Sequence, residues 1–187
     1  MNKKQGFTLL ELVVVIVILG VLAAVAVPKY LDMKSEARVA AIEALEAAFE
    51  DGLRLVRVKS TMPNALLDTG GKQVWLDING NGQIDDDGNG SDTDASKNNG
   101  IDIFMIQGGG DLGWVPDNYQ IHKLVTLDPQ FEVDLSHDIN QAYIGYRFDG
   151  VDENNKPLTV RSSKCRVYYN HKVSNLSDLI RKDISGC

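Results

Sequence analysis

The chain opens with a long apolar run and continues with an amphipathic helical pattern. Residues 12–27 carry no charge, and the whole apolar run of about 20 residues is long enough to span most of a bilayer. From Ser35 onward, apolar residues recur at steps of three and four, the period of one helix face. This stripe consists of Val39, Ile42, Leu45, Phe49, Leu53 and Val56. We therefore expect one helix from about Thr8 to about Lys59, which first meets lipid or other subunits and then covers a folded domain.

Two residues weaken the continuity of this helix. Gly20 costs about 1 kcal/mol relative to alanine inside a helix. Pro28 removes a backbone donor, so we expect the helix to bend there, where it leaves the bilayer.

After Ser60 the pattern changes to short, strand-like segments separated by turn residues. The expected strands are 73–76, 101–106, 119–127, 142–148 and 158–169. The loop 149–157 between the last two predicts an antiparallel hairpin. Together these segments predict an α+β fold, with the long N-terminal helix packed on an antiparallel β-sheet.

Charge and composition narrow the function classes. The 187 residues carry a net charge of −7, which becomes −9 when residues 1–6, with their two lysines, are removed. No dense cluster of Lys and Arg interrupts this acidic character, so nucleic acid is not expected as a partner. At this length the chain can hold one globular domain with its own core besides the apolar segment.

Glu11 is anomalous, because a carboxylate near the head of an apolar segment is costly in lipid unless it finds a cation or hydrogen-bond donors. No Lys or Arg lies between Phe7 and Val27. Cleavage after Gly6 would create an α-amine on Phe7 at the same depth. Such an amine meets a carboxylate of a neighbouring chain more readily than one four residues on in its own chain, and this pairing indicates assembly.

The motif Gly6-Phe7-Thr8-Leu9-Leu10-Glu11, after Lys3 and Lys4, resembles the class III leader and N-terminus of type IV pilins and type II secretion pseudopilins. The resemblance implies that a prepilin peptidase cuts after Gly6 and N-methylates Phe7. It also implies that Glu11 guides docking of subunits into a homo-oligomeric helical filament. The subunit would lie in the inner membrane before the assembly machinery moves it into an extracellular pilus, and it would not be an enzyme.

Further segments are similar to mannose-sensitive haemagglutinin (MSHA) type pilins, which implies a surface fibre used for attachment. They are Pro28-Lys29-Tyr30-Leu31, Ser35-Glu36-Ala37-Arg38, Leu55-Val56-Arg57 and 76–82. The expected organisation is a leader (1–6), a transmembrane and filament-core helix (7–28), an amphipathic continuation (29–59) and a β-rich head (60–187). The head contains an acidic loop (77–94) and a C-terminal loop (165–187).

Cys165 and Cys187 lie on the exported side of the anchor, where an oxidising compartment permits a disulfide. The bond would fix a chain end that otherwise frays. The loop it encloses resembles the C-terminal disulfide-bounded region of type IV pilins. We therefore expect this loop on the side of the head farthest from the filament axis.

The acidic loop contains the front half of an EF-hand-like calcium pattern. The ligands would be Asp77, Asn79, Asn81, the backbone carbonyl of Gln83, and Asp85. Gly88 stands where the pattern expects a bidentate glutamate. The candidates to replace that ligand are Asp86, Asp87, Asp92 and Asp94. A flexible acidic loop without calcium is the alternative.

Catalytic motifs are not found. The glycine-rich stretch 108–113 matches G-x-G-x-x-G, but Trp114-Val115-Pro116 cannot open the helix that a dinucleotide site needs. The three histidines, His122, His137 and His171, lie in unrelated contexts.

Several alternatives remain open from the sequence. Ala24-Val25-Ala26 would suit a signal peptidase, and the apolar run could instead anchor a periplasmic calcium-binding or enzymatic domain. A type II secretion pseudopilin shares the N-terminal motif and is the second choice after a pilin.

Overall fold

The computed structural model describes residues 8–68, 73–85, 100–136 and 141–187, and the chain divides into two compact units, residues 1–38 and 39–187. Helix α1, Leu9–Ser60, contributes to both units and continues through Gly20 and Pro28 without a break in helical assignment. The predicted single helix is therefore confirmed. The bend expected at Pro28 stays a prediction.

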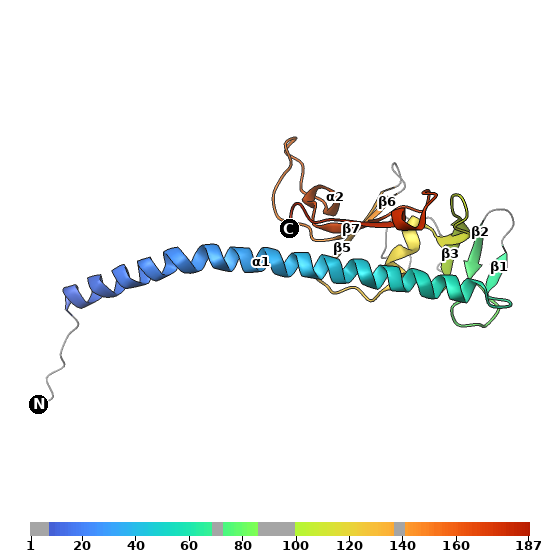
Figure 1. Ribbon diagram of the computed structural model, residues 1–187, viewed down its shortest axis with the longest axis horizontal. Helices are drawn as coiled ribbons and strands as arrows, with labels where there is room; N and C mark the ends of the chain where they lie inside the picture. The colour runs from blue at the N-terminus through green and yellow to red at the C-terminus, as the bar shows by residue number, and fades with distance from the viewer. Residues whose placement is uncertain (1–7, 69–72, 86–99, 137–140) are drawn as a thin grey trace, which may run out of the picture. The chain divides into compact units, whose positions relative to one another are not determined.

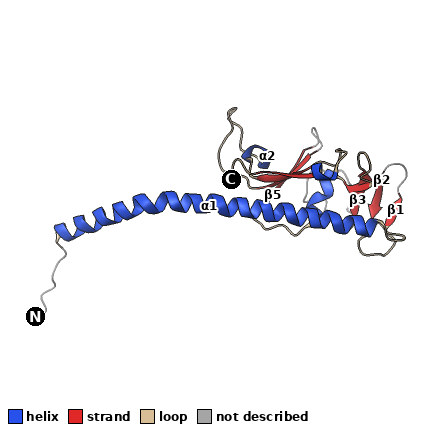
Figure 2. Ribbon diagram, viewed as in Figure 1, coloured by secondary structure: helices blue, strands red, loops and turns tan. Residues whose placement is uncertain are grey.

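The second unit contains two four-stranded antiparallel sheets beside its part of α1 (Figure 1). The first sheet has the order β1 (Leu66–Asp68), β2 (Gln73–Leu76), β3 (Ile103–Gln107) and β4 (Trp114–Pro116). The second has the order β5 (Glu132–Ser136), β6 (Gln141–Gly145), β7 (Arg166–Tyr169) and β8 (Ile180–Asp183). Figure 2 shows these strands in red beside the blue helix. The α+β class is confirmed, although one sheet was expected and two are present.

The predicted stripe on α1 supplies the helix side of the core. Ile42, Leu45, Phe49 and Leu53 pack with buried residues of the second sheet, including Ile144 and Val167. Val56 packs instead with residues of the first sheet, among them Leu76 and Met105. Burial of these side chains contributes about 1.5–3 kcal/mol each and holds this part of α1 to both sheets.

Gly52 lets another segment approach α1 closely. A Cβ at this position would lie 3.0 Å from Cβ of Leu124. Leu124 ends the 3-10 helix η2, Asn118–Leu124, which connects the two sheets. The small residue on the helix thus makes room for this connection.

The prediction of a strand at 119–127 was wrong, because η2 occupies most of this segment. The carboxylate of Asp117 accepts a hydrogen bond from the N–H of Tyr119 at 3.1 Å. The carbonyl of Asp117 accepts another from Gln120 at 2.9 Å. These local bonds favour a helical turn over an extended strand.

The expected strand at 158–169 is also shorter than predicted. Its first part forms the one-turn helix α2, Val160–Ser163, capped by reciprocal bonds between Thr159 and Ser162. Lys164 then adopts a left-handed conformation (φ 54°), and β7 begins at Arg166. The antiparallel pairing of β6 with β7 confirms the predicted hairpin partners.

Candidate functional site

The start of α1 contains a capping box made by Thr8 and Glu11. The backbone N–H and the hydroxyl of Thr8 both donate to Oε2 of Glu11 at 2.9 Å. The N–H of Glu11 donates back to the Thr8 hydroxyl at 3.3 Å. Glu11 therefore has hydrogen-bond donors within its own chain, one of the two kinds of partner expected for it. Gly6 and Phe7 lie outside the described residues.

The first unit leaves its apolar side chains uncovered. Between Leu9 and Met33 the large apolar residues are exposed on every face of the helix. Among the described residues, α1 is the one helix long and apolar enough to cross a membrane by length and composition. A surface of this kind requires lipid or other apolar chains around it.

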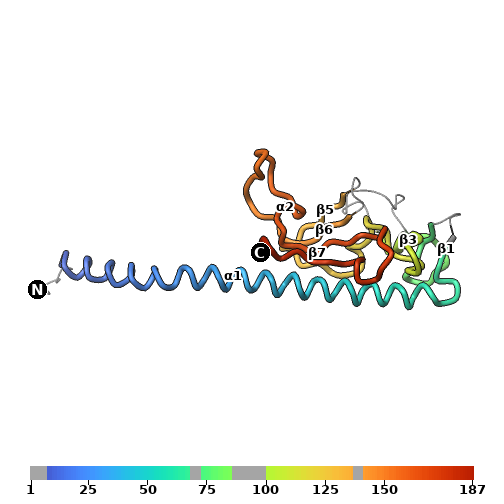
Figure 3. Tube along the Cα trace, turned by 45° about the horizontal axis from the view of Figure 1, so that its top comes forward, coloured from blue at the N-terminus to red at the C-terminus, as the bar shows by residue number. Residues whose placement is uncertain are grey.

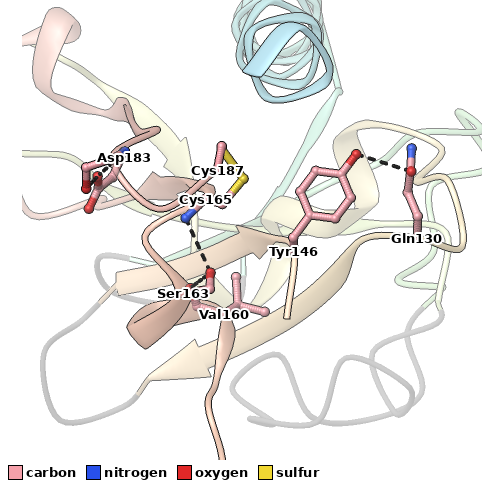
Figure 4. Close-up of a disulfide and its surroundings, with 8 residues drawn as sticks. Gln130, Tyr146, Val160, Ser163, Cys165, Asp183 and Cys187 are labelled. Carbon is pink, nitrogen blue, oxygen red and sulfur yellow. Dashed lines mark hydrogen bonds between the residues drawn. A yellow bond between two sulfur atoms is a disulfide. The ribbon is translucent and has the colours of Figure 1, made fainter. Parts of the chain in front are cut away.

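The C-terminal residue is joined to the core of the second unit by the predicted disulfide, which is confirmed. Figure 4 shows Cys165 bonded to Cys187, with the N–H of Cys165 donating to the Ser163 hydroxyl at 3.3 Å. The Cα atoms of the two cysteines lie 4.8 Å apart. Cys165 is fully buried, so the bond ties the end of the chain to the interior.

The position expected for the disulfide-bounded loop, farthest from the filament axis, stays a prediction. The segment between the cysteines contains β7, a central strand, and β8, an edge strand. Nζ of Lys182 in β8 lies 2.9 Å from Glu46 and 3.2 Å from Glu43 on α1. Within the second unit, the segment thus returns to α1.

The front half of the acidic loop brings its predicted side chains together. The carboxylate of Asp77 accepts hydrogen bonds from the N–H groups of Gly80 at 2.6 Å and Gly82 at 2.8 Å. The side-chain amides of Asn79 and Asn81 donate to one oxygen of Asp85, at 2.6 and 2.7 Å. Four of the five predicted ligand residues therefore gather through side-chain oxygens and amides.

Hydrogen bonds within the loop also lower the pKa of Asp77 and hold the backbone of Gln83. The N–H of Gly82 is the main cause that lowers the pKa of the Asp77 carboxyl, which is accordingly ionised at neutral pH. The N–H of Gln83 donates to Oδ1 of Asn81 at 2.8 Å, and a ligand role for its carbonyl stays a prediction. Asp86, Asp87, Gly88, Asp92 and Asp94 lie outside the described residues. In the described ranges, no three His, Cys, Asp or Glu side chains form a metal-binding group.

Asp102 supports this loop and was not predicted. It is fully buried, and its two carboxylate oxygens accept from the N–H of Ile78 at 2.9 Å and of Asp85 at 2.7 Å. Both ends of the loop 78–85 are thus fixed by one side chain that follows it in the sequence. No spacing rule predicts this contact, since Asp102 lies 17 residues beyond Asp85.

The capping box did have a sequence signal. Thr8-Leu9-Leu10-Glu11 is a T-x-x-E pattern before an apolar run, which is typical of a helix N-terminus. Lys182 had no such signal, because its partners on α1 lie more than 130 residues earlier.

Of the histidines, His137 lies outside the described residues. His171 is buried, and its backbone N–H donates to the side-chain carbonyl of Asn118 at 3.1 Å. Burial is the main cause that lowers the pKa of His171 to about 4. Its imidazole is therefore neutral at physiological pH and serves packing.

Comparison with known proteins places these features in a family. A family model described as "Prokaryotic N-terminal methylation motif" matches residues 1–27. The "Type IV major fimbrial protein FimA" of Dichelobacter nodosus is 30% identical over 173 residues, which are 87% of this chain and 99% of that protein. The "Type IV narrow pilus major component PilA5" of Thermus thermophilus is 33% identical over 111 residues, 58% of this chain and 90% of that protein.

A "Fimbrial protein" of Moraxella nonliquefaciens is 50% identical over 54 residues, 29% of this chain and 32% of that protein. No solved structure matches the chain. The N-terminal motif, the exposed apolar start of α1 and the match across nearly the whole of FimA agree, and the chain belongs to the type IV pilin family.

Proposed function

We propose that this chain is the structural subunit of a type IV pilus and polymerises into a helical surface filament. The observation that carries the proposal is the exposed apolar surface of α1 from Leu9 to Val27, in which Glu11 is the one charged residue and which the N-terminal methylation motif covers. Such a surface suits lipid before assembly and the apolar helices of neighbouring subunits afterwards. The similarity to FimA, a type IV major fimbrial protein, and to PilA5, a major component of a type IV narrow pilus, supports this role.

Processing and localisation follow from the same proposal. A prepilin peptidase would cut between Gly6 and Phe7, and the new subunit would wait in the inner membrane with α1 as its anchor. Assembly would then move it into an extracellular pilus. The carboxylate of Glu11, which accepts hydrogen bonds from Thr8 in the single chain, would exchange that partner for the Phe7 amine of a neighbour.

We further propose that the pilus is of the MSHA type and serves adhesion. The support is the set of segments at 28–31, 35–38, 55–57 and 76–82. A type II secretion pseudopilin remains the second candidate, because the N-terminal motif is common to both. The Cys165–Cys187 bridge favours the pilin.

Calcium binding at the acidic loop is a separate proposal. The side chains of Asp77, Asn79, Asn81 and Asp85 converge on one loop, and an ion there would take carboxylate and amide oxygens, the ligands that calcium prefers. Turning the Asn79 and Asn81 amides about their last bond would present oxygen in place of nitrogen. The ion would fix a loop on the surface of the head.

Immunogold electron microscopy of intact cells tests the main proposal. Antibodies against the head should label long extracellular fibres, and the fibres and label should both disappear when the gene is deleted and return when it is restored. Label confined to the cell envelope, without fibres, would favour the pseudopilin or the anchored periplasmic domain.

A further inference from the structure

A groove on the head lies between α1 and the segment that leads into β8. It encloses about 570 Å³, and its apolar lining comes from Leu53 on α1 and from Leu179 and Ile180 on the opposite side. Leu176 also lines the groove and is 56% exposed. The groove can therefore take an apolar side chain that is presented from outside.

Two arginines of α1 line the same groove. Nη1 of Arg54 lies 3.0 Å from Asp51, and its side chain remains 72% exposed. Nη2 of Arg57 donates to the carbonyl of Leu112 at 3.4 Å, and the residue also lines the groove. Glu50 is the one carboxylate among the lining residues, and it lies 3.9 Å from Nη2 of Arg54. The two arginines and this glutamate leave the lining with one net positive charge, which is carried by Arg57. The complement of the groove is an apolar side chain flanked by carboxylates.

The loop 149–157 of this chain has that composition. Val151 is 55% exposed and is flanked by Asp149, Asp152 and Glu153. Oδ1 of Asp152 accepts hydrogen bonds from the N–H groups of Asn154 and Lys156, each at 2.9 Å. A bridge between Val151 and Pro157 closes the loop at its base. The loop is thus ordered before any partner arrives, which lowers the entropy lost on docking.

The groove and the loop belong to opposite ends of the second sheet. Gly145, the last residue of β6, pairs with Arg166, the first residue of β7, so the loop 149–157 begins at this end. Tyr169, the last residue of β7, pairs with Ala142 and Ile180, so the segment 170–179 begins at the other end. In Figure 3 the orange loop beside α2 and the red segment after β7 leave the sheet at opposite ends.

We infer that the groove of one subunit receives the loop 149–157 of a second copy of this chain, with Val151 in the groove and the carboxylates of the loop beside Arg54 and Arg57. A contact between two different patches is head-to-tail, and it generates an open helical chain of subunits when its rotation does not close into a ring. This inference rests on the proposed function, because it names a contact within the proposed filament. It adds a contact between heads to the packing of the apolar helices.

Paired cysteines in assembled fibres test this contact. The native cysteines are bonded to each other, and the described residues contain no free thiol. In the variant Val151→Cys with Leu176→Cys, mild oxidation of fibres should shift the subunit band into a ladder of multimers on non-reducing gels, and reductant should collapse it. The matched control is Val151→Cys with Leu55→Cys, because Leu55 is an exposed leucine like Leu176 (71% against 56%) but lies on α1 and does not line the groove.

Fibres of the test variant that stay monomeric on the gel, or an equal ladder in the control, would overturn the inference. Each single-cysteine variant should give dimers at most. A second measurement uses unchanged fibres: an amine-reactive cross-linker should join Lys156 of the loop to Lys172, which precedes the groove segment, and should not do so in isolated subunits. Other cross-links between subunits without this one would also overturn the inference. An absence of fibres in the unchanged strain would instead contradict the proposed function itself.

Discussion

The ammonium of Lys182 lies 2.9 Å from the carboxylate of Glu46, and this ion pair joins the last strand to α1 within the second unit. Lys182 belongs to the segment closed by the Cys165–Cys187 disulfide. Two different bonds therefore fix the end of the chain, one covalent to the core and one ionic to the helix. Their expected contributions to stability differ.

Loss of the disulfide should destabilise the head strongly. Cys165→Ser with Cys187→Ser opens a loop of 22 residues, and the chain-entropy model gives a loss of about 3 kcal/mol in the free energy of unfolding. Lys182→Met is the control, since a partly exposed ion pair contributes about 1 kcal/mol or less. Urea unfolding of a soluble chain that begins at Ser35 measures both values. Equal losses in the two variants would contradict this ranking.

Acid should destabilise the head through His171. Its pKa is lowered from 6.5 to about 4, so its contribution to stability is complete above pH 6.5 and is lost as the pH falls toward 4. Between these two pH values, His171 binds a proton in the unfolded chain but not in the folded head. Between pH 7 and pH 4.5 this one group should lower the free energy of unfolding by about 2–3 kcal/mol.

The variant His171→Asn isolates this effect from that of the carboxylates. Two charged groups lie near the imidazole. Oδ2 of Asp117 is 4.0 Å from Nδ1 of His171, and Lys172 is the next residue in the chain. The variant lowers stability at pH 7 but should flatten the dependence between pH 7 and pH 4.5. Parallel curves for the two proteins would show that His171 does not bind its proton differently on unfolding.

Much of this architecture was predictable from local pattern. The stripe from Ile42 to Val56 predicted the buried face of α1, because a helix repeats its faces every 3.6 residues. The prediction for the segment 119–127 was wrong. Its apolar and polar residues alternate as in a strand, but Asp117 caps the 3-10 helix that begins at Asn118. The partners of Asp102 and Lys182 could not be predicted, because each contact joins segments that only the folded chain brings together.

Calcium should stabilise the head if the acidic loop binds it. At a calcium concentration about 100 times the dissociation constant, the gain in the free energy of unfolding is about 2.7 kcal/mol. The melting temperature of the soluble chain, and protection of the loop from protease, should both fall with chelator. Identical behaviour with calcium and with chelator would leave an acidic loop without an ion.

Substitution of one predicted calcium ligand distinguishes binding at the acidic loop from a general effect of negative charge on the head. Asp85→Asn should abolish the calcium response. The control is Asp152→Asn, which removes the same charge from the loop 149–157. The Asp152 carboxylate accepts backbone hydrogen bonds in that loop, so this variant also loses loop contacts but should keep the calcium response. A lost response in both variants would indicate charge screening.

Glu11 should matter for assembly and not for membrane insertion. Glu11→Ala removes a carboxylate that is costly in lipid, so insertion should be unchanged or better while fibres become scarce. Glu11→Gln keeps an acceptor for the Thr8 N–H but carries no charge. Sheared-fibre yield and membrane fractionation measure the two steps. Normal fibres from Glu11→Gln would show that assembly does not need an ion pair between Glu11 and the Phe7 amine.

The N-terminus of the chain in surface fibres tests the central claim most directly. The proposed pilus subunit is cut between Gly6 and Phe7 and keeps its apolar helix for the filament. Mass spectrometry of fibres sheared from cells should give an N-terminal peptide that begins with methylated Phe7. A mature chain that begins near Val27 would establish a cleaved signal peptide and contradict the pilus subunit proposed here.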